Sequence, residues 1–359
     1  MTVATGTARR TFRRRAVAAT AITALTITAC GDADGERLAT SDAGTVTVRN
    51  CGAEVTFPAP AERLFVNDGN LISMVLAIGA QDQVAAVSSI QRDKEVLRTH
   101  YGDAVDRLEE VSKDYPSRET VIARRPDVMV AGWNYGYDES KNLTPASLAE
   151  HDIAAYVLTE SCRQGDGAAR GVVDPWTALD RDLINLGEIT GHQDEAAAVA
   201  EDIDRRVAGL RAAPQETDVP TLFLFDSGEK AVFSSGRFGA PQAIIEAAGG
   251  RNALEDLDDT WTEVSWERLA ASKPDAFVFV DYPPQTVAQK IAILRAHPAT
   301  KDLPAVKQER FLNLPYAMWT SSPLNVDAAE RVRASLEEWR LVPAGGVGSS
   351  TGSSTVEPR

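Results

Sequence analysis

The sequence predicts an α/β protein with two similar lobes joined by a single long helix. Short apolar runs of strand length alternate with helical segments, a helix-to-strand pattern occurs twice, 148 residues apart, and one long helical pattern lies between the copies. Runs that are apolar on both faces are typical of parallel strands buried beneath helices. Each lobe is therefore expected to be Rossmann-like.

The chain begins with the features of an export signal. Arg9 and Arg10 open an arginine-rich segment, residues 16–29 carry no charge, and Cys30 follows directly. An uncharged stretch of fourteen residues is too short to cross a bilayer, which takes ~20 helical residues. The pattern predicts a cleaved signal peptide at residues 1–29, export by the twin-arginine route and lipid attachment at Cys30. A basic arm on a buried helix is the alternative.

The exported chain is strongly acidic. Residues 1–29 contain five arginines and no acids, so their removal leaves 32 basic against 52 acidic residues and a formal net charge of −20. This charge repels nucleic acid and anionic lipid, which leaves membrane attachment to the acyl chains. Residues 30–44 predict a lipidated flexible spacer, and the Gly/Ser/Thr-rich residues 344–359 predict a disordered tail.

The elements between these ends divide into an N-terminal lobe at 45–190, a connecting helix at 191–215 and a C-terminal lobe at 216–343. Two alternating segments on either side of Asn50-Cys51-Gly52 predict a hairpin. An apolar stripe at helical spacing runs from Val199 to Leu210 and predicts the connecting helix. The predicted strands are 45–48, 54–57, 63–66, 84–87, 127–130, 154–158, 221–225, 276–280 and 311–314.

The repeated pattern runs from Ser117 to Val130 and again from Ser265 to Val278. The copies share Ser, Glu, Ala, Pro, Asp and Val in the same register. Serine is a good N-cap, and proline ends the helix before Asp opens the strand. The match predicts a duplicated unit, although common helix-to-strand grammar can also produce it.

Two cysteines remain in the body of the chain, Cys51 and Cys162. Outside the cytoplasm thiols oxidise when their geometry permits, so the location predicts a disulfide between them. In the chain-entropy model a loop of about 110 residues would contribute ~4 to 5 kcal/mol. Two separate buried thiols are the alternative. A zinc site is not expected, because neither cysteine has a cysteine or histidine neighbour at ligand spacing.

Taken together, the lipid anchor, hairpin, two lobes and connecting helix resemble the class III substrate-binding proteins of ABC importers. The resemblance covers about residues 45–340. Its specific motifs are the two Glu-x(6)-Pro-Asp segments, Leu-Gly-Glu-Ile-Thr-Gly at 186–191 and Ala-His-Pro-Ala-x(3)-Leu-Pro-Ala-Val at 296–306. Gly-Trp-Asn-Tyr-Gly-Tyr at 132–137 and Glu-Ser-Cys at 160–162 look like an actinobacterial-type branch. The resemblance implies the class III periplasmic binding protein fold and a ferric siderophore, cobalamin or heme as ligand.

In that family one glutamate on each lobe meets arginines of the transmembrane permease, and the motif places these at Glu119 and Glu267. A serine N-cap puts each glutamate at the second helical position, from which it can point outward rather than close a capping box. The alternative is that these acids only offset the helix macrodipole. We expect a monomer that needs no cofactor and has the permease subunits as protein partners.

A ligand cleft is expected at the carboxyl ends of the strands, where α/β sheets bind their ligands. Aromatic rings there suit a bulky flat chelate, and arginines suit the negative charge of a ferric complex. Ordinary packing is the alternative for any one of these side chains. The candidates are Asn67, Asn70, Trp133, Tyr135, Arg163, Ser227, Arg237, Trp261, Tyr282, Tyr316 and Trp319.

Two other classes of function fit the sequence less well. A receptor for a naked metal ion needs convergent ligands, which the four histidines, at 100, 151, 192 and 297, do not provide. An extracellular hydrolase is suggested only by Asp226-Ser227-Gly228, and the Gly-x-Ser-x-Gly, Gly-x(4)-Gly-Lys and His-Glu-x-x-His motifs are missing. The sequence therefore predicts a lipid-anchored receptor for a ferric siderophore, with cobalamin or heme as the alternative ligand.

Overall fold

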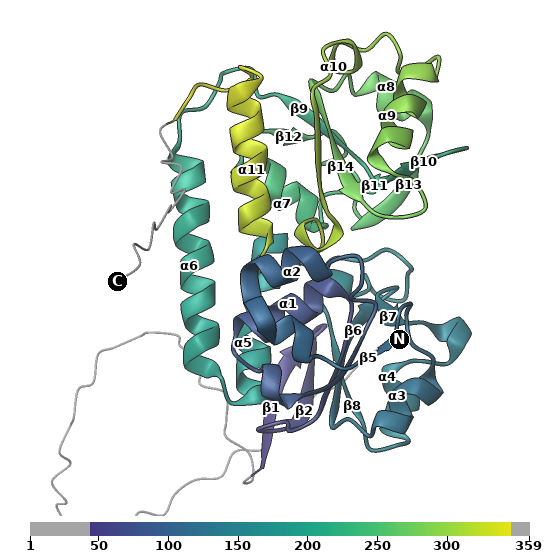
Figure 1. Cartoon of the computed structure of the whole chain (residues 1–359), viewed down its shortest axis with the longest axis vertical. Coiled ribbons are helices and arrows are strands. Elements are labelled where there is room, and N and C mark those ends of the chain that lie inside the picture. The colour runs from purple at the N-terminus through teal and green to yellow at the C-terminus, as the bar shows by residue number, and fades with distance from the viewer. Residues whose placement is uncertain (1–43, 346–359) are drawn as a thin grey trace, which may run out of the picture. The chain divides into compact units, whose positions relative to one another are not determined.

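The structure is a computed structural model in which residues 44–345 are described. The predicted signal peptide, Cys30, nearly all of the spacer and nearly all of the tail lie outside these residues. Within them, no helix is both long and apolar enough to cross a membrane. Figure 1 labels the helices and strands.

The N-terminal lobe contains a parallel sheet with helices on both faces. Alternate residues of its strands enter two core clusters: Leu64 and Val66 pack on the side of α1 and α5, whereas Phe65 packs on the side of α3 and α4. The strand order is β5-β4-β3-β6, and β8 pairs with the free side of β6. The elements are β1 (Thr45–Asn50), β2 (Ala53–Pro58), β3 (Leu64–Asn67), α1 (Gly69–Ala77), β4 (Val84–Ser88), α2 (Lys94–Tyr101), β5 (Glu110–Ser112), α3 (Arg118–Arg124), β6 (Val128–Trp133), β7 (Gly136–Tyr137), α4 (Pro145–Ala149), β8 (Ala154–Val157) and α5 (Pro175–Thr190).

The C-terminal lobe contains a second parallel sheet of order β12-β9-β14-β15 and a small antiparallel sheet of order β10-β11-β13. The antiparallel sheet was not predicted, because its strands are only two to four residues long. The elements are β9 (Thr221–Phe225), β10 (Ser227–Gly228), β11 (Val232–Ser235), α7 (Ala240–Ala247), β12 (Arg251–Asn252), β13 (Trp261–Val264), α8 (Trp266–Ala271), β14 (Ala276–Asp281), α9 (Val287–Ala296), α10 (Pro304–Lys307), β15 (Phe311–Pro315) and α11 (Asn325–Glu338).

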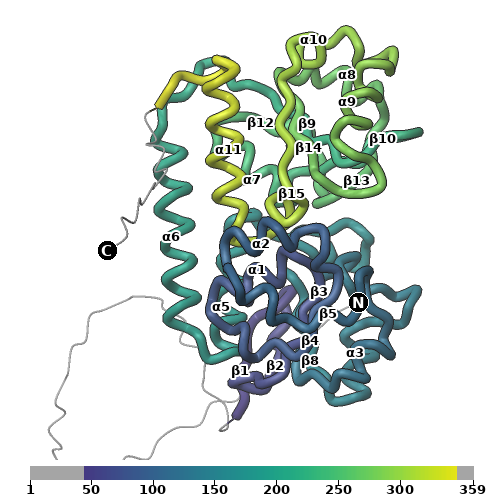
Figure 2. The backbone as a smooth tube through the Cα atoms, in the orientation of Figure 1, coloured from purple at the N-terminus to yellow at the C-terminus, as the bar shows by residue number. Residues whose placement is uncertain are grey.

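The connecting helix is α6 (Gln193–Ala212). Its apolar stripe is buried at Ile203, Val207 and Leu210, while Val199 is only partly buried. The helix contacts α5 of the first lobe and α11 of the second, and Figure 2 shows it running past both. The predicted α/β fold of two parallel-sheet lobes around one long helix is confirmed. All nine predicted strands are present, with ends that differ by at most three residues.

The two copies of the sequence repeat have similar structures at the start and at the end of their helices, α3 and α8. Ser117 accepts a hydrogen bond from the backbone N–H of Thr120 at the start of α3, and Ser265 accepts the equivalent bond at the start of α8. Both helices are followed by a left-handed residue, Arg125 (φ 48°) and Lys273 (φ 45°), before the proline. The shared serine and proline therefore fix the length of each helix in the same way.

The repeated aspartates tie neighbouring strands together at their beginnings. The Oδ2 atom of Asp127 accepts the backbone N–H groups of Glu62 and Arg63, at 2.8 and 2.9 Å, just before β3. The Oδ2 atom of Asp275 accepts the backbone N–H of Thr221, the first residue of β9, at 2.8 Å. Each carboxylate thus satisfies backbone donors that the parallel ladder leaves open.

The predicted disulfide joins Cys51 to Cys162, with a Cα–Cα distance of 5.2 Å. It ties the turn of the β1–β2 hairpin to the segment that follows β8. The neighbouring Asn50 side chain exchanges two hydrogen bonds with the backbone of Val157 in β8. The hairpin is therefore held to the N-terminal lobe both covalently and by buried hydrogen bonds.

Candidate functional site

The loops at the carboxyl ends of the two sheets face each other. Three side chains of the N-terminal lobe, at or near these strand ends, reach across to the segment after β15. Asn70 donates to the carbonyl of Ser321 at 3.1 Å, Asp93 accepts the N–H of Ala317 at 2.9 Å, and Glu160 accepts the N–H of Ser321 at 3.1 Å. The strand ends therefore meet where the fold places binding sites.

Partly exposed aromatic and cationic side chains from both lobes surround this junction. The Arg92 guanidinium lies 4.6 Å from the centre of the Tyr282 ring, across the lobes. The Arg163 guanidinium lies 3.9 Å from a ring centre of Trp133, within the N-terminal lobe. Phe233 is also partly exposed and stacks on Trp261 at 6.0 Å between ring centres. These surfaces can contact a bulky aromatic or anionic ligand.

Asp68 forms the first buried cluster of the junction. It is fully buried and accepts hydrogen bonds from the hydroxyls of Tyr115 at 2.9 Å and of Tyr316, in the other lobe, at 3.1 Å. The Arg92 guanidinium forms an ion pair with the other carboxylate oxygen of Asp68, Oδ1, at 3.0 Å. Burial nevertheless raises the pKa of Asp68, although Arg92 opposes the shift. The nearby Asp93 carboxyl has its pKa raised to about 7, again mainly by burial.

Glu160 forms the second buried cluster. Its carboxylate, which is almost completely buried, accepts the backbone N–H of Ala240 at 3.2 Å and the indole N–H of Trp261 at 3.3 Å, both from the C-terminal lobe, as well as the N–H of Ser321. The hydroxyl of Tyr135 lies 3.4 Å away. Burial raises the pKa of Glu160 to about 7. Glu160 therefore gathers donors from three separate C-terminal segments.

The predicted ligand residues divide into two groups, and the first group keeps some exposed surface. Trp133, Arg163 and Tyr282 are partly exposed at the lobe junction. Ser227 is partly exposed at the start of β10. Arg237 is exposed, pairs with Asp258 at 3.0 Å and lines a separate polar cavity of about 340 Å³. Of the two predicted arginines, Arg163 thus lies beside Trp133 at the lobe junction, whereas Arg237 lies at a separate cavity.

The remaining predicted residues are buried. Asn70, Tyr135, Trp261 and Tyr316 belong to the lobe junction described above. The other two, Asn67 and Trp319, are expected at the cleft but lie wholly in the interior. Asn67 bonds Tyr135 and Ser88, and the Trp319 indole donates to the carbonyl of Phe279 at 3.0 Å. Trp319 is 0% exposed, so in this structure it offers no surface to a ligand.

Sequence analysis missed Asp68, Arg92, Tyr115, Glu160 and Arg170. A wider use of the strand-end rule would have found the first two, because Asp68 directly follows β3 and Arg92 lies in the loop after β4. Glu160 was part of the Glu-Ser-Cys motif but received no role. Tyr115 and Arg170 gave no local signal, since only the fold brings them to the junction.

The two glutamates of the repeat occupy exposed positions on α3 and α8, away from the junction (Figure 1). The Glu119 side chain is 75% exposed and lies 3.6 Å from Arg118. Beside Glu267, the rings of Trp266 and His297 stack with centres 4.0 Å apart. Backbone N–H groups at the helix starts lower the pKa of both glutamates, so both are ionised at neutral pH.

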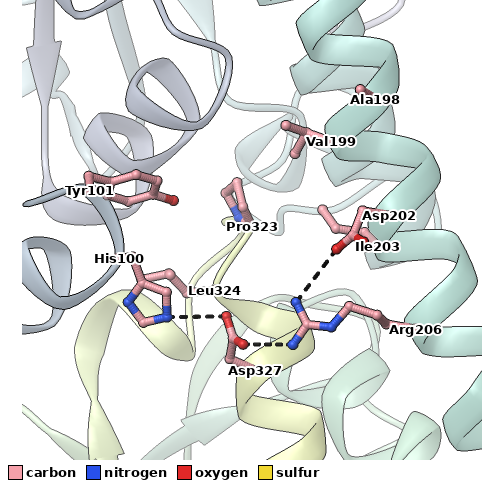
Figure 3. Close-up of a pocket in the computed structure, with 10 residues that line it drawn as sticks. All are labelled: His100, Tyr101, Ala198, Val199, Asp202, Ile203, Arg206, Pro323, Leu324 and Asp327. Atoms are coloured by element: carbon pink, nitrogen blue, oxygen red, sulfur yellow. Dashed lines mark hydrogen bonds and ion pairs between the residues drawn. The ribbon is translucent and has the colours of Figure 1, made fainter. Parts of the chain in front are cut away.

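A cavity of about 350 Å³ lies where α2, α6 and α11 meet (Figure 3). The Nε2 atom of His100 on α2 lies 3.4 Å from Asp327 on α11. Arg206 on α6 pairs with Asp327 at 2.6 Å and with Glu330 at 2.7 Å. This network joins the connecting helix and both lobes through Asp327. Within residues 44–345, no group of three or more His, Cys, Asp or Glu side chains is placed to hold a metal ion.

Comparison with known proteins agrees with this architecture. Residues 68–317 match the family model described as periplasmic binding protein. A vitamin B12-binding protein of Yersinia pseudotuberculosis serotype O:3 (strain YPIII) is 25% identical over 229 residues, which cover 62% of this chain and 71% of that protein.

Two solved structures have a similar fold. One is described as the ABC-type Fe3+-hydroxamate transport system of Saccharomonospora viridis DSM 43017. It has a TM-score of 0.65 and 21% sequence identity, and the match covers 81% of this chain and 98% of that chain. The other is a periplasmic heme binding protein from Pseudomonas aeruginosa. It has a TM-score of 0.59 and 21% sequence identity, and the match covers 79% of this chain and 94% of that chain.

Proposed function

The chain belongs to the periplasmic binding protein family, and we propose that it is a lipid-anchored receptor that captures a ferric siderophore and delivers it to the permease of an ABC importer. Members of this family are binding proteins of transport systems and not enzymes. The proposal adds three points to family membership: the ligand, the docking residues and the anchor.

The observation that carries the ligand proposal is the lobe junction, where aromatic rings come from both lobes and two guanidinium groups come from the N-terminal lobe. Trp133 and Arg163 lie on one side, and Tyr282 lies on the other beneath Arg92. Aromatic faces suit a large planar or macrocyclic ligand, and guanidinium groups suit carboxylate, hydroxamate or catecholate oxygens. A ferric siderophore combines both features.

Cobalamin or heme is the second candidate ligand. Tyr115 and Tyr282 are partly exposed at the cleft, and a tyrosine oxygen is able to ligate heme iron. The similar proteins, a vitamin B12-binding protein, an Fe3+-hydroxamate transport system and a heme binding protein, support a bulky chelate without choosing one.

Titration of the intrinsic tryptophan emission tests the ligand. The full chain is titrated with a ferric trihydroxamate, a ferric catecholate, cobalamin and hemin. We expect saturable quenching, strongest for one of the two ferric siderophores. Saturation by cobalamin or hemin alone would select the second candidate, and no saturation by any of the four would contradict a chelate receptor.

We assign permease docking to Glu119 and Glu267, because both are exposed, ionised and equivalent in the repeat. The double variant Glu119→Ala/Glu267→Ala should keep the affinity for the ligand and abolish uptake in cells. Glu195→Ala is a matched control, since Glu195 is also exposed in the first turn of a helix, α6. A parallel loss of affinity in the double variant would contradict a docking role.

The anchor is assigned to Cys30 from the signal that precedes it. Cys30→Ser should move the protein from the membrane fraction to the medium or periplasm while ligand affinity is kept. Retention of the variant in the membrane fraction would contradict lipid attachment at this residue. We also propose that the receptor is a monomer, which its elution volume in size-exclusion chromatography tests.

A further inference from the structure

A segment of the N-terminal lobe crosses to the C-terminal lobe beside the cleft. We call it the strap, residues 163–173, which follows the disulfide-bonded Cys162. The side chain of Gln164 donates to the carbonyl of Asp258 at 3.0 Å, and the backbone N–H of Arg170 donates to Asp259 at 3.0 Å. The strap therefore adds hydrogen bonds between the lobes to those that Asn70, Asp93 and Glu160 make.

Close backbone packing holds the end of the strap. Gly171 has a φ of +89°, and a Cβ atom there would lie 2.1 Å from the Cβ atom of Phe238 in the C-terminal lobe. Any side chain at this position would both strain the backbone and push the lobes apart. The strap thus packs against Phe238 too closely for any side chain at position 171.

Arg170 occupies the centre of this crossing. Its side chain donates to the carbonyl of Trp261 at 3.1 Å and to the carbonyl of Trp133 at 3.4 Å, and these two tryptophans belong to opposite lobes. Its guanidinium also lies 5.7 Å from the centre of the Tyr135 ring. One rigid planar cation thereby joins the backbones of two aromatic residues across the cleft.

The surroundings compensate the buried charge of Arg170. Arg170 is only 7% exposed, and a buried cation is tolerated when carboxylates and hydrogen bonds accompany it. The carboxyl group of Glu160 lies near enough for the positive charge of Arg170 to favour its ionised form. Glu160 also accepts the indole N–H of Trp261. Trp261 is therefore held at its backbone carbonyl by Arg170 and at its indole ring by Glu160.

We propose that Arg170 is a positioning residue that fixes Trp133 relative to Trp261 across the lobe junction and so selects ligands by size. The proposal rests on the proposed ligand site between the lobes. Arg170 acts through the tryptophans and not by touching the ligand, since it is buried and its two terminal nitrogens donate to protein carbonyls.

Arg163 provides a matched control on the same strap. It also lies over a cleft aromatic, at 3.9 Å from a ring centre of Trp133, but it is partly exposed and its ion pair is with Glu139, at 2.7 Å. All of these groups belong to the N-terminal lobe. Arg163 therefore supplies charge to the cleft, whereas Arg170 links the two lobes.

The first test compares ligand selectivity in the full chain for Arg170→Ala, Arg170→Lys and Arg163→Ala. A ferric trihydroxamate, cobalamin and hemin are the probes. Arg170→Ala should lower the affinity for the best ligand at least about tenfold and change the others by less than about threefold, since a loosened wall penalises the best-fitting ligand most. Arg170→Lys should recover part of the selectivity, because lysine keeps the charge but not the planar fork.

Arg163→Ala should weaken anionic ligands without changing their order. If Arg170→Ala weakened all probes equally, or if the losses in Arg163→Ala followed the fit of each probe and not its charge, size selection by Arg170 would be refuted. Thermal unfolding of each variant shows whether the fold is kept, and Arg170→Lys carries the test if the alanine variant does not fold.

The second test needs no ligand. Hydrogen exchange in residues 257–262 of the C-terminal lobe should be faster in Arg170→Ala than in the wild type, and unchanged in Arg163→Ala. Equal exchange in Arg170→Ala and the wild type would overturn the proposal. If the wild type bound no probe, the proposed function would fail, and this exchange measurement would still decide whether Arg170 holds the lobes.

Discussion

The two lobes share a helix-to-strand repeat but contribute different chemistry to the surface where they meet. The N-terminal lobe brings buried charged side chains, Asp93, Glu160 and Arg170 among them. The C-terminal lobe contributes mainly backbone groups that bond to them, such as the N–H of Ala317 and the carbonyl of Trp261. The comparison teaches that the two lobes share the helix-to-strand frame of the repeat, whereas the loops at their strand ends contribute different groups.

This division has a physical advantage. A carboxylate accepts several hydrogen bonds, and charge-assisted bonds are stronger than neutral ones. A neutral backbone group opposite a charge needs no second long side chain to be fixed in place, so less conformational entropy is lost. The disadvantage is desolvation, which is why burial raises the pKa of both Glu160 and Asp93 to about 7.

The largest expected effect concerns a feature found only in the N-terminal lobe, the disulfide. Cys51→Ser/Cys162→Ser should lower the free energy of unfolding by about 4 to 5 kcal/mol, because the unfolded chain is no longer constrained by the loop between them. Urea unfolding measures this loss. Hydrogen exchange should rise most in the β1–β2 hairpin.

Reduction of the wild type should reproduce the effect, and reductant should not change the double variant further. A loss below about 1 kcal/mol would mean that the hydrogen bonds of Asn50 and the core packing of Val48 and Phe57 hold the hairpin without the disulfide. The difference between the lobes would then be one of packing and not of covalent structure.

The next effect sharpens the comparison at equivalent positions of the repeat. Asp127 accepts two backbone N–H groups and Asp275 accepts one. Asp127→Ala should therefore cost about 2 kcal/mol of unfolding free energy and Asp275→Ala about 1 kcal/mol, each measured by urea unfolding.

The control is Asp218, an exposed residue in the loop between α6 and β9. Asp218→Ala should change the free energy of unfolding by less than about 0.5 kcal/mol. A larger loss in Asp275→Ala than in Asp127→Ala would show that the two aspartates are not used in the same way.

The smallest expected effect is a pH dependence at the contact of α2 with α11. Asp327 raises the pKa of His100 above its ordinary value of 6.5, chiefly through their hydrogen bond, although Arg331 opposes it. Because the folded-state pKa is the higher one, the stabilisation is complete below about pH 6.5 and is lost as the pH rises through the raised value.

The difference in unfolding free energy between the wild type and His100→Gln isolates this group from Glu160 and Asp93, which titrate with the same sign. It should shrink by at most about 1 kcal/mol between about pH 5.5 and about pH 8.5. A difference that grew with pH would contradict the assigned ion pair.

Local sequence patterns were sufficient for most of the fold. The strand at 221–225 and the helix starting after Ser117 each rest on signals within a few residues, an apolar run and an N-cap. The β10–β11–β13 sheet escaped detection because its short strands are stabilised by one another and not by a local pattern.

The candidate site was predicted less completely. Strand-end reasoning selected Trp133, Arg163 and Tyr282, which are partly exposed at the lobe junction. It also selected Trp319, whose indole instead donates to the carbonyl of Phe279 in the core. A residue type at a strand end indicates the correct region, but it does not tell which way the side chain points.

The sequence by itself determined the α/β class, the two lobes, the connecting helix and the pair of cysteines, because periodicity, caps and composition act over short stretches of chain. Only the tertiary structure decided that Arg170 bridges Trp133 and Trp261 and that Glu160 gathers amides from Ala240 and Ser321. These contacts join residues about 40 to 160 positions apart, and burial and hydrogen bonding between such distant groups depend on how the lobes pack.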